Sequence, residues 1–163
     1  MDIDRTSFQL GMINCFAEMV AVGVKCLAIS PPLDPEEYEG IRETSEAIVE
    51  GSGIRSFLER SLLITDLQST DFTRGKCSIL YYKDEETLAA YLALKKRKEA
   101  LEAESAYTPA ARWEISREFM RLLSYPDEII EEKIRSGGES DPFILDKGSS
   151  APVGQSFLKG MTP

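Results

Sequence analysis

Residues 6–29 read TSFQLGMINCFAEMVAVGVKCLAI and form the most hydrophobic stretch of this 163-residue chain. One set of its apolar side chains recurs every three or four residues, as on one face of a helix: Phe8, Met12, Cys15, Met19, Val22, Cys26 and Ile29. Other apolar residues fill much of the remaining circumference, and a helix that is apolar nearly all round is typically buried. The stretch therefore predicts a central N-terminal helix, which Pro31 and Pro32 end because proline lacks an N–H donor.

The next segment, residues 34–51, carries the clearest helix signals in the chain. Asp34 suits the N-cap, Pro35 the first turn, and Glu37 the third position of a capping box. Gly51 is a natural C-terminal stop. Seven acidic residues and a single arginine lie between Asp34 and Glu50, so this helix is expected to carry an acidic outer face.

Further helices are expected over residues 54–61, 84–104, 109–123 and from 126 onward. Two short apolar segments, about 62–67 and 76–82, resemble buried strands. Only eight residues separate them, which is too few for a parallel crossover, so they would pair antiparallel. Alternatively, 62–67 extends the helix before it. The fold prediction is mainly α: a single-domain helical bundle around the buried N-terminal helix, with an optional two-stranded β element.

A change in composition at residue 137 divides the chain. Five of the eleven glycines and three of the eight prolines lie from this point to the end. Residues 1–136 are therefore expected to form the helical domain, and 137–163 an extended or flexible C-terminal arm.

The overall composition excludes several classes of chemistry. The chain has no histidine, so Ser-His and Cys-His nucleophile pairs and His-liganded zinc sites are absent, and no motif predicts a metal or another cofactor. The net charge of −9 argues against binding to nucleic acid or to an anionic membrane. An acidic start and charges within the apolar stretch fit neither a signal peptide nor a membrane span. Three cysteines without a close pair favour reduced, buried thiols, so a cytoplasmic protein is expected.

The first candidate catalytic set lies in the N-terminal helix. Asn14, Glu18 and Lys25 follow one another at i, i+4 and i+11, which places them on one helical face. Desolvation in a pocket would raise the pKa of Glu18 and lower that of Lys25, toward values useful for acid–base chemistry. Lys25 would then act as base or Schiff-base nucleophile, with Glu18 as its proton partner. The alternative is that this polar line is simply the solvent-facing edge of the helix.

Two loops supply candidate ligand-binding residues. Ser52 and Gly53 at a helix start would present backbone N–H groups to an anion, and Arg55 would add a bidentate donor. The alternative is a C-capping glycine followed by an N-capping serine, which simply joins two helices. Arg74 lies in a polar loop, residues 70–76, that would line a site or act as a connector.

The run of four basic residues from Lys95 to Lys98 is interpreted as a solvated helix face. Glu99 and Glu102 follow at i, i+4 from Lys95 and Lys98, so two of the four positive charges have a nearby partner. This pairing argues against a nucleic-acid site on that helix.

No motif is specific enough to indicate a family, and two functional classes follow from these features. The first is a binding or accessory subunit that docks on a protein partner or forms a homo-oligomer, motivated by the acidic helix and the C-terminal arm. The alternative is a small-molecule enzyme in which the Glu18/Lys25 pair acts on an anionic metabolite that Arg55 anchors. In either case, the net negative charge argues against a nucleic-acid or membrane partner.

Overall fold

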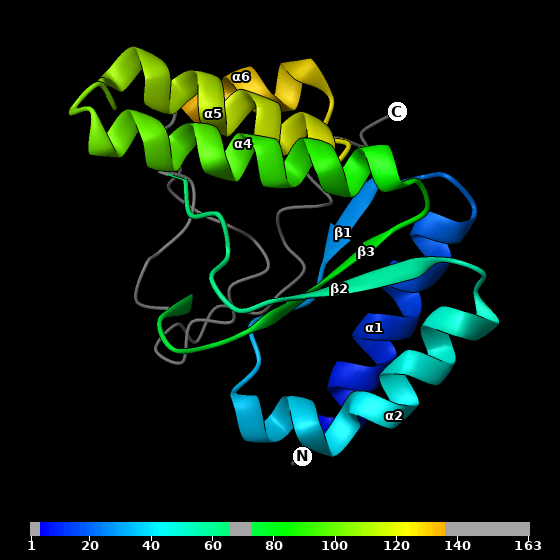
Figure 1. Ribbon diagram of the computed structural model, residues 1–163. Coiled ribbons are helices and arrows are strands. Elements are labelled where there is room, and N and C mark those ends of the chain that lie inside the picture. The colour runs from blue at the N-terminus through cyan, green and yellow to red at the C-terminus, as the bar shows by residue number, and fades with distance from the viewer. Residues whose placement is uncertain (1–3, 66–72, 136–163) are drawn as a thin grey trace, which may run out of the picture.

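The computed structural model describes residues 4–65 and 73–135, in which a small β-sheet lies between two layers of helices (Figure 1). In chain order the elements are α1 (Arg5–Ala21), β1 (Leu27–Ile29), α2 (Pro35–Gly51), β2 (Arg55–Glu59), β3 (Ser78–Tyr82), α4 (Glu85–Ala103), α5 (Pro109–Leu122) and α6 (Asp127–Arg135). The C-terminal arm expected over 137–163 lies outside the described residues.

Three described strands form the sheet in the order β1-β3-β2, and both outer strands run antiparallel to β3. β1 and β2 are therefore parallel to each other, with α2 connecting them and β3 inserted between them. This is a split β-α-β arrangement. Tyr82 pairs with Leu27 on one side and with Arg55 on the other, while Glu59 pairs with Ser78 at the opposite end of the ladder.

The central strand explains why helices cover both faces of the sheet. All five residues of β3 are buried, and alternation sends Ile79 and Tyr81 to one face and Leu80 and Tyr82 to the other. A strand that is apolar on both faces needs a covering layer on each side.

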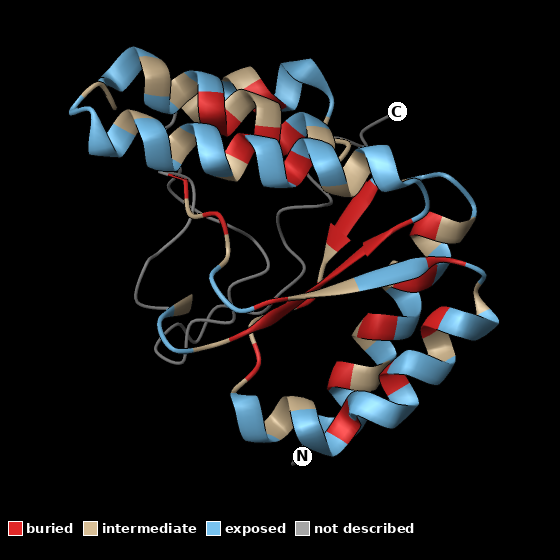
Figure 2. Cartoon of the chain, viewed as in Figure 1, coloured by how far each residue is buried: buried red, intermediate tan, exposed pale blue. Residues whose placement is uncertain are grey.

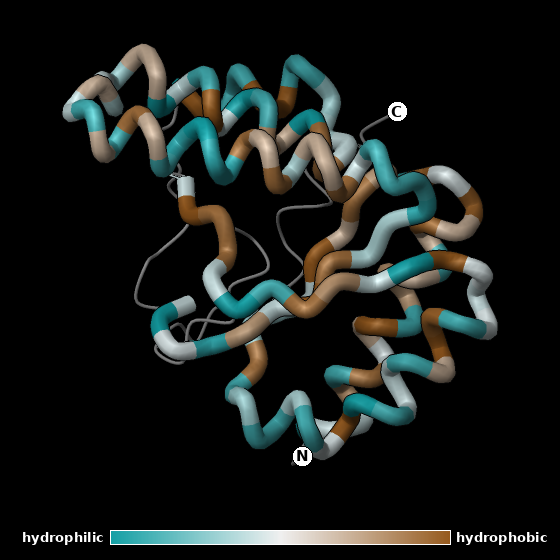
Figure 3. The backbone as a smooth tube through the Cα atoms, in the orientation of Figure 1, coloured by the Kyte–Doolittle hydropathy of each residue, from teal (hydrophilic) through white to brown (hydrophobic). Residues whose placement is uncertain are grey.

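α1 and α2 cover one face of the sheet, where Ile13, Ile41 and Val49 pack around Tyr81. α4 and α5 cover the other face, where Tyr91, Ile115 and Phe119 meet the second set of strand side chains, and α6 packs on α5. Figure 2 shows this division as buried residues in β1, in β3 and on the helix faces toward the sheet, with exposed residues on the outer helix faces and at the start of β2. Hydrophobic residues follow the same distribution in Figure 3.

The expectation of a mainly helical protein is confirmed, and the helices expected over 34–51, 84–104, 109–123 and from 126 correspond to α2, α4, α5 and α6. The capping box of α2 forms as expected, since the Asp34 N–H donates to a Glu37 carboxylate oxygen at 3.0 Å. The bundle around a central N-terminal helix is not what the structure has. α1 lies in an outer layer and buries only Gln9, Ile13, Ala17 and Val20, because the sheet takes the central position.

α1 is also shorter than expected, ending eight residues before Ile29. Gly23 adopts φ +79°, and the Val24 N–H donates to the Met19 carbonyl at 2.9 Å, which closes the helix. Residues 27–29 then pair with β3. Tertiary pairing thus overrides the helical spacing that continues through this segment.

The expected helix over 54–61 is wrong, because residues 55–59 form β2. A segment this short gains little as a helix, whereas five residues paired along β3 satisfy their backbone groups. The strand expected over 76–82 is confirmed as β3, but its partners are β1 and β2. Residues 62–65 are not a strand, and 66–67 lie outside the described residues.

None of the helices in the described ranges is long and apolar enough to cross a membrane.

Candidate functional site

The structure does not bring Asn14, Glu18 and Lys25 together on one helical face. Asn14 and Glu18 are exposed on the outer side of α1, while Lys25 follows the helix, beyond the Gly23 turn. The Lys25 Nζ donates to the Leu123 carbonyl at 2.8 Å and lies 5.2 Å from the centroid of the Tyr125 ring. Burial lowers the pKa of Lys25, as the sequence argument expected, but at a different place in the molecule.

Lys25 is placed as a cap for the end of α5. Its ammonium group satisfies a carbonyl at the helix C-terminus, where a positive charge is favourable. The next residue adds a second link, since the Cys26 N–H donates to the Ser124 hydroxyl at 2.8 Å. Together these two contacts hold the start of β1 against the connection between α5 and α6.

The segment from Ser52 to Arg55 leads into a strand, so it contains no helix start that presents N–H groups to an anion. The Ser52 hydroxyl donates to the Ile48 carbonyl at 2.8 Å, and Gly53 adopts φ +66° at the end of α2. Arg55 opens β2 and forms an ion pair with Glu85 of α4. Arg74 is exposed before β3, at the other end of the strand ladder from Arg55, so the structure separates these two arginines.

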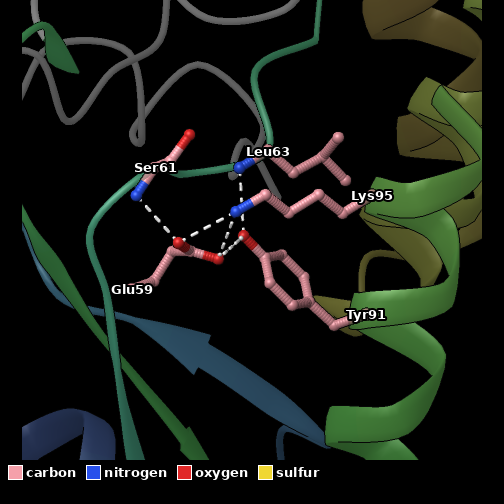
Figure 4. A network of polar contacts seen from close by, with 5 residues as sticks. All are labelled: Glu59, Ser61, Leu63, Tyr91 and Lys95. Carbon is pink, nitrogen blue, oxygen red and sulfur yellow. Dashed lines mark hydrogen bonds and ion pairs between the residues drawn. The ribbon is translucent and has the colours of Figure 1, made fainter. Parts of the chain in front are cut away.

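A buried polar network that the sequence pattern did not indicate lies at the end of β2 (Figure 4). Glu59 is 4% exposed, and the Nζ of Lys95 lies 3.0 Å from each of its carboxylate oxygens. The Tyr91 hydroxyl donates to Glu59 at 3.0 Å and accepts the Leu63 N–H at 3.0 Å. The Ser61 N–H adds a further bond to Glu59 at 2.8 Å.

These contacts saturate the Glu59 carboxylate. Each of its oxygens accepts two hydrogen bonds, which uses the roughly four acceptor sites that a carboxylate offers. Burial raises the pKa of Tyr91, so its hydroxyl remains a proton donor to Glu59. The network therefore fastens residues 59–63 to α4 and leaves no open lone pair for a substrate.

An alternating strand pattern would have revealed Glu59. Phe57 belongs to the core cluster beneath α4 and α5, and a residue two positions further along a strand points to the same face. Tyr91 and Lys95 are one helical turn apart, so both face this strand from α4. The alternation of Phe57 and Glu59 along a strand was not recognised because residues 54–61 were expected to be helical.

Three of the four residues in the basic run on α4 form ion pairs, and one of these pairs was expected from the sequence. Lys98 pairs with Glu102 at 2.6 Å, and Arg97 pairs with Glu118 at 2.9 Å. Lys95 differs from the expectation, since its partner is Glu59 on the neighbouring strand and not Glu99 on its own helix.

An open groove of about 440 Å³ lies beside α4 and α5, and its wall includes Cys26, Glu86, Glu118 and Arg121. Two of these charges are already paired, Glu118 with Arg97 and Arg121 with Asp127. Cys15 and Cys26 are exposed, so only Cys77 fits the expectation of buried thiols, and burial raises the pKa of Cys77. Across residues 4–65 and 73–135, no three potential metal ligands gather at one point.

The outer side of α1 carries a second row of apolar side chains, which we call the apolar stripe: Phe8, Met12, Cys15, Met19 and Val22. Phe8 is 41% exposed and Val22 is 69% exposed, Cys15 is exposed, and the two methionines are half-buried. The spacing of four, three, four and three residues matches the a and d positions of a helix-pairing seam.

α2 lies beside α1 in the same layer, and five exposed glutamates line it: Glu36, Glu39, Glu43, Glu46 and Glu50. Their spacing of three or four residues puts them on one side of the helix, and we call this row the acidic stripe. Glu39 pairs with Arg42 at 3.4 Å. For the other four, the described part of the chain supplies no ion-pair partner.

Comparison of the chain with protein-family models, with curated proteins and with solved structures gives no match. A functional assignment therefore rests on the residues themselves. The outer surface of α1 and α2 is one part of the described chain whose apolar and acidic side chains the described fold leaves exposed.

Proposed function

We propose that this chain is a cytoplasmic binding protein, an accessory subunit that docks on a protein partner through the outer surface of α1 and α2. The observation that carries this proposal is the apolar stripe. A helix at the surface of a globular protein typically has one apolar side, facing the core. α1 has that side in Ile13, Ala17 and Val20, and it has the stripe in addition.

Gly11 supports an external contact on the same side of α1. A glycine inside a helix costs roughly 0.5–1 kcal/mol relative to alanine. Gly11 is exposed, and a Cβ added there would meet nothing within 4 Å, so packing among the described residues does not require it. A missing side chain allows the backbone of another molecule to approach closely.

Catalysis by Glu18 and Lys25 has less support. Glu18 is exposed on α1, whereas the Lys25 ammonium is occupied by the Leu123 carbonyl and the Tyr125 ring. The exposed thiols of Cys15 and Cys26 fit a reducing compartment.

Site-specific photo-crosslinking tests the proposal. A benzophenone amino acid replaces Cys15 within the stripe, and in a control protein it replaces Glu99, which is exposed on α4. In the cell of origin we expect a discrete protein adduct, identified by mass spectrometry, from position 15 and none from position 99. Absence of an adduct at position 15, or the same adducts from both positions, would overturn the proposal.

A further inference from the structure

The shape and charge of this surface indicate what kind of segment occupies it. The apolar stripe runs from Phe8 to Val22, a rise of roughly 21 Å at about 1.5 Å per residue. Side chains at a and d spacing form knobs and holes that accept the side chains of another helix. The stripe therefore fits an amphipathic helix of about four turns.

The acidic stripe determines the charge of that helix. Like charges three or four residues apart destabilise a helix by a few tenths of a kcal/mol per pair. Glu36, Glu43, Glu46 and Glu50 form no ion pair within the described residues that would relieve this repulsion. α2 packs on α1, and packed helices lie about 8–10 Å apart, so a helix bound on the apolar stripe would lie beside α2, and lysine or arginine side chains at its edge would reduce this repulsion.

Other occupants fit less well. A second copy of the chain would bring a net charge of −9 and its own acidic stripe toward the first. Three of the four consecutive basic residues of α4 are already engaged, since Lys95, Arg97 and Lys98 are paired with Glu59, Glu118 and Glu102, and a single exposed Lys96 does not match a row of five glutamates. An anionic membrane surface would be repelled by the same carboxylates.

We propose that the partner of this surface is a basic amphipathic helix, whose apolar side packs on the apolar stripe while its lysine or arginine side chains face the acidic stripe. This inference rests on the proposed function, and it adds the chemistry of the partner segment.

A designed peptide tests the inference directly. The probe is a fluorescein-labelled helical peptide of about 18 residues with leucine at a and d positions and lysine at the flanking positions. A matched peptide has glutamate in place of every lysine. Fluorescence anisotropy measures the binding of each peptide to the full-length protein. We expect the lysine peptide to bind, more weakly as salt is raised, and the glutamate peptide not to bind.

Two pairs of variants locate the binding. The E43K/E46K variant removes charge from the acidic stripe, and we expect its Kd for the lysine peptide to rise about tenfold. The control variant E99K/E132K makes the same change in net charge on exposed positions of α4 and α6, and it should change Kd by less than about twofold. Cys15→Glu, at an exposed position of the stripe, should also weaken binding, with circular dichroism confirming that the helices remain folded.

Failure of the inference is separable from failure of the proposed function. Equal binding of both peptides, no binding of the lysine peptide, or equal weakening by E43K/E46K and E99K/E132K would overturn the basic-helix assignment. If crosslinking at position 15 then still captures a partner, or a second copy, the docking function stands and only the chemistry of the occupant is wrong. No adduct at position 15 overturns both.

Discussion

The Lys95 ammonium lies 3.0 Å from both carboxylate oxygens of Glu59, and this ion pair joins the end of β2 to the middle of α4. Lys95→Met would leave the Glu59 carboxylate buried with its charge uncompensated. We expect the variant to lose roughly 3 kcal/mol of unfolding free energy in urea denaturation. Lys96→Met is the matched control, since Lys96 is exposed and adjacent, and it should change little. Equal effects of the two variants would contradict a structural role for the pair.

The same network shows how far sequence reasoning reaches in this chain. Helices with strong local signals were predicted well, as with the Asp34 N-cap and Pro35 of α2, because capping depends on neighbouring residues. The strands were predicted less well. β1 and β2 are three and five residues long, and each is a strand because β3 pairs with it.

The candidate sites depended on those element assignments. Extending α1 to Ile29 placed Lys25 on the same face as Glu18, whereas the Gly23 turn separates them. Expecting a helix after Gly53 hid Glu59, which only a strand places beneath α4. In contrast, the outward row of apolar residues on α1 was visible in the spacing of Phe8, Met12, Cys15, Met19 and Val22. Only the structure reveals that the opposite side of α1 covers the sheet.

The buried tyrosines predict a loss of stability in alkali. Burial raises the pKa of Tyr81 and Tyr91 above the ordinary value of 10.0, so the folded state retains protons that the unfolded chain releases. This contribution to stability is fully present below pH 10 and is lost as the pH rises above it. Tyrosinate absorbance should therefore appear in two phases, the second coinciding with unfolding by circular dichroism. A single phase completed while the protein is folded would contradict the burial of these hydroxyls.

The ion pair between α5 and α6 predicts the acid dependence of stability. Arg117 donates from Nε to Glu131 at 2.6 Å and from a terminal nitrogen at 3.0 Å, and these bonds lower the pKa of Glu131 below its usual 4.5. A carboxylate with a depressed folded pKa stabilises the fold above its unfolded pKa, and the effect is lost as the pH falls through the folded value. Glu131→Gln should therefore be less stable at neutral pH and lose less stability on acidification. Glu132 is exposed on the same helix, and the Glu132→Gln variant should lose as much unfolding free energy on acidification as the wild-type protein does.

Four helices in the described chain end with a residue in the left-handed region, and two of these residues are not glycine. Gly23 and Gly53 follow α1 and α2, whereas Ser105 and Ser124 follow α4 and α5 with φ of 56° and 64°. In both turns, the N–H of the residue after the serine donates to a carbonyl in the last turns of the preceding helix. Ala106 donates to the Leu101 carbonyl at 2.8 Å, and Tyr125 donates to the Met120 carbonyl at 3.0 Å.

These two serines provide a matched pair for glycine substitution. A side chain in the left-handed region costs roughly 1 kcal/mol, which glycine avoids, so Ser105→Gly should raise the unfolding free energy by about that amount. Ser124→Gly should gain less, because it also removes the hydroxyl that accepts the Cys26 N–H at 2.8 Å. Thermal and urea unfolding of both variants measure the difference. An equal gain at the two positions would mean that the Ser124 hydroxyl contributes nothing to holding β1 against the end of α5.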